Sequence, residues 1–280
     1  MKTTIVEYFA NYVKEQLGIV YESSNYYQLE KRLEELAKFE NCATLEDLYT
    51  KAMRFGISGP FKQTLLDLAT NNETSFFRDP KIFSQIEKDI FPHFVKHGKK
   101  VIRIWSTASS FGQEIYSLLM LHAEMAAGSK PAIIDFLATD ISEKALQKAS
   151  EGIYSHLETT RGLTPDLQDK YFKPASVPNH WQVRSDLRSK VRFKSQNILD
   201  PFSHHGKFDL ILCRNILIYQ TVDSKKKVLD RLFDQLADHG VLIMGVGESM
   251  IGLTDKFEQF STESASIYKK KILKTAKKVA

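Results

Sequence analysis

The sequence predicts an α/β fold, in which a parallel sheet with helices on both faces follows a small all-helical domain. Downstream of Lys99, short apolar runs typical of buried strands alternate with helical segments, an order that favours a parallel sheet. Upstream of Lys99 the apolar residues follow helical spacing, and no strand-like alternation of any length appears. A chain of 280 residues is long enough for a small domain followed by a medium one.

The N-terminal part, residues 1–80, is expected to be a helical domain. Three leucines recur at intervals of four and three, which places them on one helix face: Leu29, Leu33 and Leu36. Thr44, followed three residues later by Asp47, is typical of a helix start. We expect a further helix over 60–70 and a linker helix over 81–98.

The second domain is expected to cover residues 99–280. Its predicted elements are a strand over 101–105, a helix over 114–127, a strand over 132–139, a helix over 141–149, a strand over 208–213, a helix over 225–237 and a strand over 241–244. Pro174, Pro178 and Trp181 interrupt this alternation within short alternating stretches. They predict a small inserted antiparallel unit at about 165–193, and the segment 257–272 is expected to supply closing strands.

Composition and charge exclude several classes of protein. Hydrophobic residues make up 42% and charged residues 26%, and no run reaches the roughly 18 apolar residues that a membrane span needs. Charged residues within the first 18 positions argue against a signal peptide, so we expect a cytoplasmic protein without membrane insertion. The net charge of +5 weakly favours acidic partners. Cys42 and Cys213 lie far apart, which argues against a disulfide framework or a zinc site, and we expect no metal.

The loop after the first strand of the sheet indicates what kind of ligand the edge binds. Residues 106–114, STASSFGQE, are small and include a single glycine, so the GxGxxG pattern that cradles a pyrophosphate is missing. A nucleoside without phosphates fits better than a dinucleotide. Asp140, at the end of the second strand, can accept hydrogen bonds from ribose hydroxyls, and Glu114 can attract an ammonium group. S-adenosylmethionine carries both groups and a sulfonium.

Each of these side chains also has a purely structural interpretation. Glu114 can favour the helix dipole, and Asp140 can cap the next helix. Asn197 can read an adenine edge with its amide, or form a turn before Asp200 and Pro201. From the residues alone the turn is the preferred interpretation of Asn197. Glu114 and Asp140 together, at the ends of neighbouring strands, favour a nucleoside site.

Seven blocks of sequence resemble the CheR-type chemotaxis receptor methyltransferases, and they occur in that family's order. They are NETSFFRD (72–79), WSTASS (105–110), GQEIYS (112–117), ATDI (138–141), NILDP (197–201), FDLILCRNILIY (208–219) and GES (247–249). The first block resembles the family's NxTxFFR signature, and the blocks span nearly the whole chain. The chain departs from the family's pattern at Phe111, Ile115 and Val246.

The resemblance implies a helical N-terminal domain that contacts the receptor, joined to a Rossmann-like class I methyltransferase domain with an inserted antiparallel β-subdomain. It implies S-adenosylmethionine as methyl donor, S-adenosylhomocysteine as product and receptor glutamates as acceptors, in chemosensory adaptation. The cofactor contacts that it implies are Asn72, Thr74, Arg78, Glu114, Asp140, Asn197, Ile198, Cys213, Arg214 and Asn215. Arg78 and Tyr219 are implied to lie closest to the transferred methyl group.

Esterification of a glutamate requires no general base, because a carboxyl group of pKa ~4.3 is already ionised at neutral pH. Arg78 can neutralise a carboxylate through its fork of donors, and Tyr219 can aim the attacking oxygen with one hydrogen bond. The sequence leaves open whether Arg78 faces the carboxylate of the donor or of the acceptor. It also leaves structural interpretations, an ion pair of Arg78 with Asp79 and a core position for Tyr219.

Two other functions compete with receptor methylation. Residues 215–219, NILIY, loosely resemble the NPPY-type motif of nucleic-acid amine methyltransferases, but they lack its prolines. A module that binds the cofactor without turnover is the second alternative. We expect no nucleic-acid partner, a monomeric chain, and the cytoplasmic helices of methyl-accepting receptors as partners. The helix over 26–38 mixes basic and acidic residues, whereas well-known members of the family are more basic there.

Overall fold

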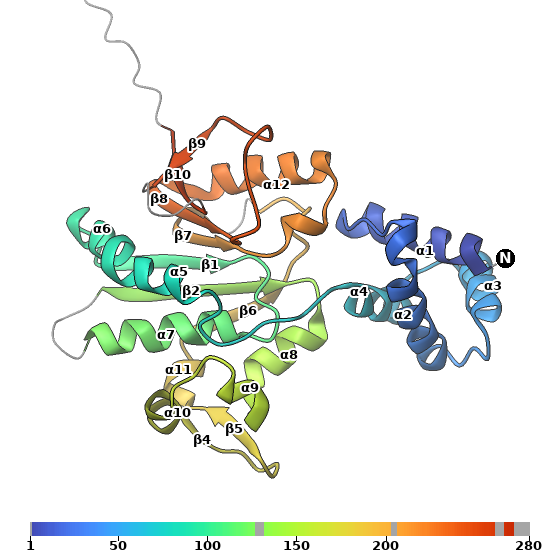
Figure 1. Cartoon of the computed structure of the whole chain (residues 1–280), viewed down its shortest axis with the longest axis horizontal. Coiled ribbons are helices and arrows are strands. Elements are labelled where there is room, and N and C mark those ends of the chain that lie inside the picture. The colour runs from blue at the N-terminus through green and yellow to red at the C-terminus, as the bar shows by residue number, and fades with distance from the viewer. Residues whose placement is uncertain (1, 127–131, 203–205, 261–265, 272–280) are drawn as a thin grey trace, which may run out of the picture.

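The computed structural model describes residues 2–126, 132–202, 206–260 and 266–271. A seven-stranded sheet has helices on both faces, and the N-terminal helices lie beyond the carboxyl ends of its parallel strands (Figure 1). The predicted α/β class is therefore confirmed. Within the described ranges, no helix is long and apolar enough to cross a membrane.

The N-terminal helices form a cluster with its own apolar core. Their bounds are α1 (Lys2–Leu17), the 3-10 helix η1 (Ser23–Asn25), α2 (Tyr26–Phe39), α3 (Leu45–Phe55) and α4 (Gly59–Ala69). Leu29, Leu33 and Leu36 are fully buried there, as their spacing predicts. Asp47 N–H donates to Thr44 Oγ1 at 3.1 Å and Thr44 N–H donates to Asp47 Oδ2 at 3.0 Å, which completes the predicted capping box.

A second helical segment follows the N-terminal cluster in the chain and packs on the sheet. It consists of α5 (Pro80–Gln85), the π-helical turn η2 (Ile86–Ile90) and α6 (Phe91–Lys96). The π turn ends two residues before Pro92, which has no N–H for the carbonyl four residues earlier, and a wider turn accommodates that defect. Ile86, Ile90 and Phe94 are fully buried in one core with β1, so this segment packs on the sheet.

The main sheet has the strand order β6-β2-β1-β7-β8-β10-β9. Its strands are β1 (Val101–Ser106), β2 (Ile133–Asp140), β6 (Val191–Ser195), β7 (Phe208–Cys213), β8 (Leu236–Met244), β9 (Phe257–Gln259) and β10 (Ile267–Lys270). The five strands β6, β2, β1, β7 and β8 pair in parallel. At the other edge, β10 pairs antiparallel with β8, and β9 pairs antiparallel with β10. The flanking helices are α7 (Gln113–Ala126), α8 (Glu143–Glu151) and α12 (Val222–Gln235). Residues 127, 261–265 and 272 of the predicted elements lie outside the described ranges.

Side chains of the central strand β7 alternate between the two faces of the sheet. Leu210 and Leu212 belong to the cluster that includes α7, whereas Ile211 and Cys213 belong to the cluster that includes α12. Both faces are therefore dry, as a parallel sheet between helices requires. Polar groups can meet a ligand only beyond the strand ends.

A second, antiparallel sheet of three strands lies beside the main one, but its bounds differ from the prediction. Its order is β3-β5-β4, with β3 (Ile153–Ser155), β4 (Phe172–Pro174) and β5 (His180–Val183), and the helices α9 (His156–Thr160), α10 (Pro165–Tyr171) and α11 (Ser185–Arg188) surround it. Its first strand precedes the predicted start at about 165. Residues 191–193 are instead part of β6, which pairs with β2 at the edge of the main sheet. Because β6 is an edge strand, it exposes alternate residues, here Arg192 and Lys194. Its sequence therefore shows the alternation that is also typical of an antiparallel strand.

Candidate functional site

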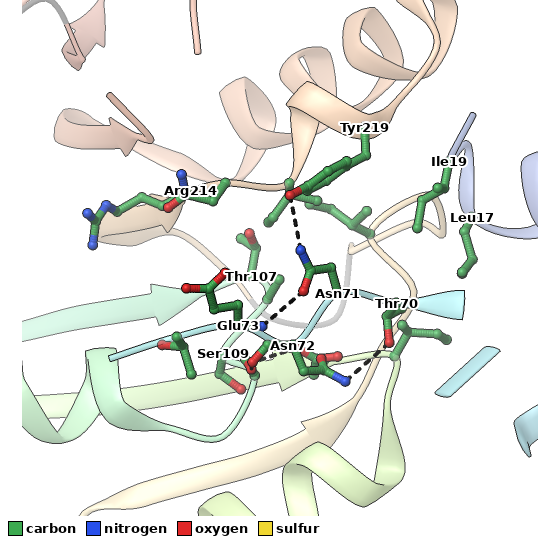
Figure 2. Close-up of a pocket in the computed structure, with 18 of the residues that line it drawn as sticks. Leu17, Ile19, Thr70, Asn71, Asn72, Glu73, Thr107, Ser109, Arg214 and Tyr219 are labelled. Atoms are coloured by element: carbon green, nitrogen blue, oxygen red, sulfur yellow. Dashed lines mark hydrogen bonds between the residues drawn. The ribbon is translucent and has the colours of Figure 1, made fainter. Parts of the chain in front are cut away.

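A pocket with about 950 Å³ of empty space, its open mouth included, lies at the carboxyl ends of the parallel strands. The loops after β1, β2, β6 and β7 form its floor, and the end of α1 and the segment 70–78 close it from the other side. In Figure 2, Arg214 lies at one end, Leu17 and Ile19 lie at the other, and Tyr219 lies between them. Open parallel sheets hold their ligands at this edge.

Most of the residues predicted for the site line this pocket. They are Asn72, Thr74, Arg78, Glu114, Asp140, Asn197, Ile198, Arg214, Asn215 and Tyr219. Carboxyl ends of neighbouring parallel strands meet at one edge, which is why Glu114, Asp140 and Asn197 come together although they are far apart in sequence.

Cys213 does not belong to this set, so the cofactor contact implied for this position stays a prediction that its side chain does not support. The side chain is fully buried in the cluster on the α12 face, and it is not part of the pocket lining. Burial, with the nearby carboxylate of Glu248, raises the pKa of the Cys213 thiol well above its ordinary value. The thiol is therefore a small apolar group of the core.

Arg214 ties the segment before α5 to the sheet. Its Nη1 donates to Glu114 Oε2 at 2.7 Å, and its Nη2 donates to Asp79 Oδ2 at 2.6 Å and to the carbonyl of Arg78 at 3.1 Å. Ser106 Oγ donates to Glu114 Oε1 at 3.0 Å. The two carboxylates outnumber the one guanidinium, so this buried group keeps a net negative charge that attracts a cation.

Asp140 joins the loops after β1 and β2. Its Oδ2 accepts the Ser110 N–H at 2.8 Å and its Oδ1 accepts the Ser142 N–H at 2.9 Å. Burial raises the pKa of Asp140, and these N–H groups oppose that shift. Ser142, rather than Asp140, caps α8, because its Oγ accepts the Ala145 N–H at 3.1 Å. Each carboxylate oxygen keeps acceptor capacity for a ligand hydroxyl.

The amide of Asn197 is already bonded at both ends. Its Oδ1 accepts the Leu199 N–H at 2.9 Å, a turn interaction, and its Nδ2 donates to the Gln16 carbonyl at 2.7 Å. The structural interpretation of Asn197 as a turn residue thus describes its side chain, with the addition that it anchors the end of α1. Ile198 lines the pocket beside it.

Arg78 and Tyr219 are two predicted residues whose side chains keep donors available at the pocket. Arg78 Nη1 donates to the Glu73 carbonyl at 3.1 Å, and within the described ranges the guanidinium has no ion pair. The pair with Asp79 does not form, because that carboxylate binds Arg214. Tyr219 is 40% exposed, which excludes a core position, and its hydroxyl accepts the Asn71 Nδ2–H at 3.2 Å (Figure 2).

Glu248 organises the loop after β7, a role that the sequence analysis did not predict. Its buried carboxylate accepts the N–H groups of Gly245, Asn215, Ile216, Leu217 and Ile218 at 2.7 to 3.3 Å. This holds Asn215 at a positive φ of 58°. A Cβ on Gly245 would meet Asn215 and Glu248 at 2.9 Å, so the close approach requires glycine there. The GES block marks Glu248 in the sequence, but it does not indicate which N–H groups the carboxylate binds.

Three buried polar atoms on residues of the pocket lining have no partner among the described residues: Ser109 Oγ, Arg214 Nε and Gln220 Oε1. Unpaired buried polar atoms are unfavourable by about 1–3 kcal/mol each, so polar atoms without a protein partner are typical of a ligand site. Both donors and acceptors are present, as a nucleoside with an amino acid end requires.

The comparison with known proteins agrees with this geometry. Residues 72–266 match the family described as CheR methyltransferase, SAM binding domain. The chain belongs to the CheR methyltransferase family. It is 36% identical to the chemotaxis protein methyltransferase of Vibrio parahaemolyticus, over 94% of this chain and 95% of that one. It is 34% identical to chemotaxis protein methyltransferase 1 of Pseudomonas aeruginosa, over 95% and 97%. As a member of this family, the protein is an S-adenosylmethionine-dependent chemotaxis methyltransferase.

The charges of the pocket fit the cofactor of the CheR family. Glu73 is paired with Arg161, and the carboxylates of Asp79, Glu114 and Asp140 with the guanidiniums of Arg78 and Arg214 leave one net negative charge around the pocket. S-adenosylmethionine carries a sulfonium, an ammonium and a carboxylate, which leaves one net positive charge. Pocket and ligand are therefore complementary in charge as well as in polar groups.

Proposed function

We propose that this chain transfers the methyl group of S-adenosylmethionine to glutamate side chains of methyl-accepting chemotaxis receptors, for chemosensory adaptation. The products are glutamate methyl esters and S-adenosylhomocysteine. The observation that carries the proposal is the guanidinium of Arg78, which lines a cofactor pocket and has no ion pair within the described ranges. The printed names of the curated relatives, chemotaxis protein methyltransferases, support it.

The composition of the pocket suits an acceptor that is already ionised. Among the described residues that line it there is no histidine, lysine or cysteine to remove a proton. A glutamate acceptor has pKa ~4.3 and attacks as the carboxylate, so no such base is needed. An amine or hydroxyl acceptor would have to lose a proton, and the pocket offers it only carboxylates.

The floor of the pocket is assigned to the methyl donor, which supplies an electrophilic methyl group on a sulfonium. Asp140 would accept the ribose hydroxyls, because it keeps acceptor capacity beyond its two N–H bonds. The group of Glu114, Asp79 and Arg214 would attract the ammonium through its net negative charge. Asn215 lines the same floor, and Asn72 and Thr74 line the opposite side of the pocket.

Arg78 and Tyr219 are assigned to the acceptor. Arg78 would hold the carboxylate by its planar fork of donors, which neutralises the charge as water is excluded. The Tyr219 hydroxyl accepts from Asn71 and keeps its own hydrogen, which it would donate to the attacking oxygen. Alignment of oxygen, methyl carbon and sulfur by such contacts can contribute up to ~7–11 kcal/mol of the barrier.

The N-terminal helices are proposed to meet the receptor. They lie beyond the carboxyl ends of the parallel strands (Figure 1), and Leu17 and Ile19, at and just after the end of α1, line the pocket. Arg32 does not add to an exposed basic face on α2, because its Nη1 donates to the Ala69 carbonyl at 2.8 Å and to the Tyr21 hydroxyl. We therefore expect weaker salt dependence of receptor docking than a strongly basic helix would give.

The test is transfer of a radiolabelled methyl group to receptor-containing membranes. Label that is released as methanol by mild base identifies a carboxyl methyl ester. We expect such label with the wild type and none with Asp140→Ala, compared with the wild type at equal concentration. Base-stable label, or label in nucleic acid offered in its place, would refute a glutamate acceptor. Binding of S-adenosylhomocysteine without transfer to any membrane would indicate a module without turnover.

A further inference from the structure

Gln220 is a buried polar residue of the pocket to which neither the sequence motifs nor the relatives give a role. It follows Tyr219 directly, its exposed fraction is 6%, and it belongs to the pocket lining. Its Oε1 is one of the buried atoms with no hydrogen-bond partner among the described residues. A buried carbonyl oxygen without a partner, on a residue that lines a ligand pocket, is a candidate for a hydrogen bond from a ligand.

The orientation of this side chain is fixed by the end of α1. Gln220 Nε2 donates to the Leu17 carbonyl at 3.3 Å, so a rotated amide would point its oxygen at another oxygen. The backbone is fixed as well, since Val20 N–H donates to the Tyr219 carbonyl at 2.8 Å and Thr221 N–H donates to the Gly18 carbonyl at 3.1 Å. The oxygen therefore remains an acceptor in one place.

Gln220 lies at the apolar end of the pocket. Leu17, to which it is bonded, lines the pocket together with Ile19, and both are at the far end from Arg214 in Figure 2. Asn197 is bonded to the neighbouring Gln16 carbonyl, so it belongs to the same end. Apolar side chains at this end suit a flat base, whereas the acidic group around Arg214 suits an ammonium.

We propose that Gln220 Oε1 accepts a hydrogen bond from the exocyclic amino group of the adenine of S-adenosylmethionine. The ligand has three kinds of donor: the ammonium, the ribose hydroxyls and this amino group. The first is drawn to the negative charge beside Arg214, and the second is matched by Asp140. The amide of Asn197, the other side chain considered for contact with the base, is bonded to backbone groups at both ends, whereas the Gln220 oxygen has no partner among the described residues.

Such a contact makes Gln220 a specificity-determining residue for the base. A site that presents an unpaired acceptor rejects an analogue that lacks the matching donor. Hypoxanthine has a carbonyl oxygen in place of the amino group, so in the wild type two acceptors would face each other. The inference rests on the cofactor of the family and does not depend on which side chain accepts the methyl group.

The experiment is calorimetric binding of two ligands, S-adenosylhomocysteine and S-inosylhomocysteine. We expect the wild type to bind the adenine compound roughly 10- to 100-fold more tightly. Gln220→Leu should bind the adenine compound about tenfold more weakly and the two compounds with nearly equal affinity. Gln113→Leu is the matched control: Gln113 Oε1 is also buried without a partner among the described residues, but Gln113 is not part of the pocket lining. That variant should keep the wild-type ratio.

Two results would overturn the proposal: a wild type that binds both compounds equally, or a folded Gln220→Leu that keeps the wild-type ratio. If Gln220→Leu fails to melt cooperatively, Gln220→Met is measured in its place, since its flexible chain fills the same space. If Gln220→Leu loses base selectivity but the wild type transfers no methyl group to receptor membranes, only the proposal of receptor methylation is refuted. Intact selectivity in the variant, with methyl esters formed, would refute the role of Gln220 alone.

Discussion

The floor and the rim of the pocket differ in how their charges are satisfied. We define the floor as Arg214, Glu114, Asp140 and Glu248, and the rim as Arg78 and Tyr219. Every residue of the floor is bonded to protein groups, in ion pairs or to backbone N–H groups. The rim is more open: within the described ranges Arg78 has no ion pair, and Tyr219 is 40% exposed.

Burial explains the difference. A charge without a partner is very unfavourable in a buried place, so the 3% exposed side chain of Arg214 can exist only between two carboxylates. A half-exposed guanidinium such as that of Arg78 retains water and needs no protein partner. The floor is thus organised before any ligand arrives, whereas the rim keeps donors for a second molecule. Floor variants should therefore lose stability and cofactor binding, and rim variants should lose methyl transfer alone.

The largest effect is expected for Arg214→Ala. Removal of the guanidinium leaves Glu114 and Asp79 facing each other, so we expect loss of about 3 kcal/mol in the free energy of unfolding and no detectable binding of S-adenosylhomocysteine. Denaturant unfolding and calorimetry measure the two. Arg192→Ala is the control, because Arg192 pairs with Asp135 at the exposed surface and should contribute less than about 1 kcal/mol. Wild-type stability of Arg214→Ala would contradict the account of the floor.

Arg78→Ala should lower methyl transfer at least about 100-fold and leave the fold intact. The free energy of unfolding should change by less than about 0.5 kcal/mol, since the side chain has no ion pair within the described ranges. Comparison of S-adenosylhomocysteine affinity with turnover decides which carboxylate Arg78 faces: unchanged affinity assigns it to the acceptor. Arg184→Ala removes an exposed arginine paired with Asp186 and should retain turnover. Turnover retained by Arg78→Ala itself would remove Arg78 from the mechanism.

Glu248→Gln is expected to weaken the floor without removing it. Glutamine keeps one acceptor oxygen but turns an NH₂ group towards backbone N–H donors, so we expect about 2 kcal/mol lower stability and roughly tenfold weaker S-adenosylhomocysteine binding. Thermal melts with calorimetry test both. Glu258→Gln, at an exposed ion pair with Lys269, should be neutral. A Glu248→Gln protein with unchanged affinity would show that the loop after β7 keeps its shape without the carboxylate.

The smallest effect is expected for Tyr219→Phe. It removes one hydroxyl of the rim, so turnover should fall by less than about tenfold while cofactor affinity and stability remain. Tyr27→Phe removes an exposed hydroxyl on α2 that accepts from Gln28 and lies outside the pocket lining, so kcat should remain and any receptor contact of α2 should alter KM alone. Steady-state kinetics with receptor membranes distinguishes the two variants. Weaker S-adenosylhomocysteine binding by Tyr219→Phe would place the residue with the floor.

Much of this fold follows from the sequence because its signals are local. The capping box at Thr44 depends on residues three apart, and the leucines of α2 depend on one helical period. The pocket was also predictable, because a single rule places strand ends at one edge and so joins Glu114 to Asp140. Edge strand β6 was misassigned, because alternation does not distinguish an exposed edge from an antiparallel pair.

The missed residues depend on contacts that are distant in sequence. Glu248 acts on N–H groups about 30 positions earlier, and Gln220 is held by a carbonyl more than 200 positions earlier. The side chain of Cys213 lies on the strand face that turns towards α12 and not in the pocket lining, a matter of strand register. Sequence motifs indicate which segment meets a ligand. Only the structure shows on which side of the backbone each side chain lies.

Calorimetric titration of the purified chain with S-adenosylhomocysteine shows whether the pocket binds the cofactor. We expect saturable binding at one site per chain by the wild type, and loss of that binding in an Asp140→Ala variant that still melts cooperatively. A folded wild-type protein that shows no heat of binding would contradict this expectation.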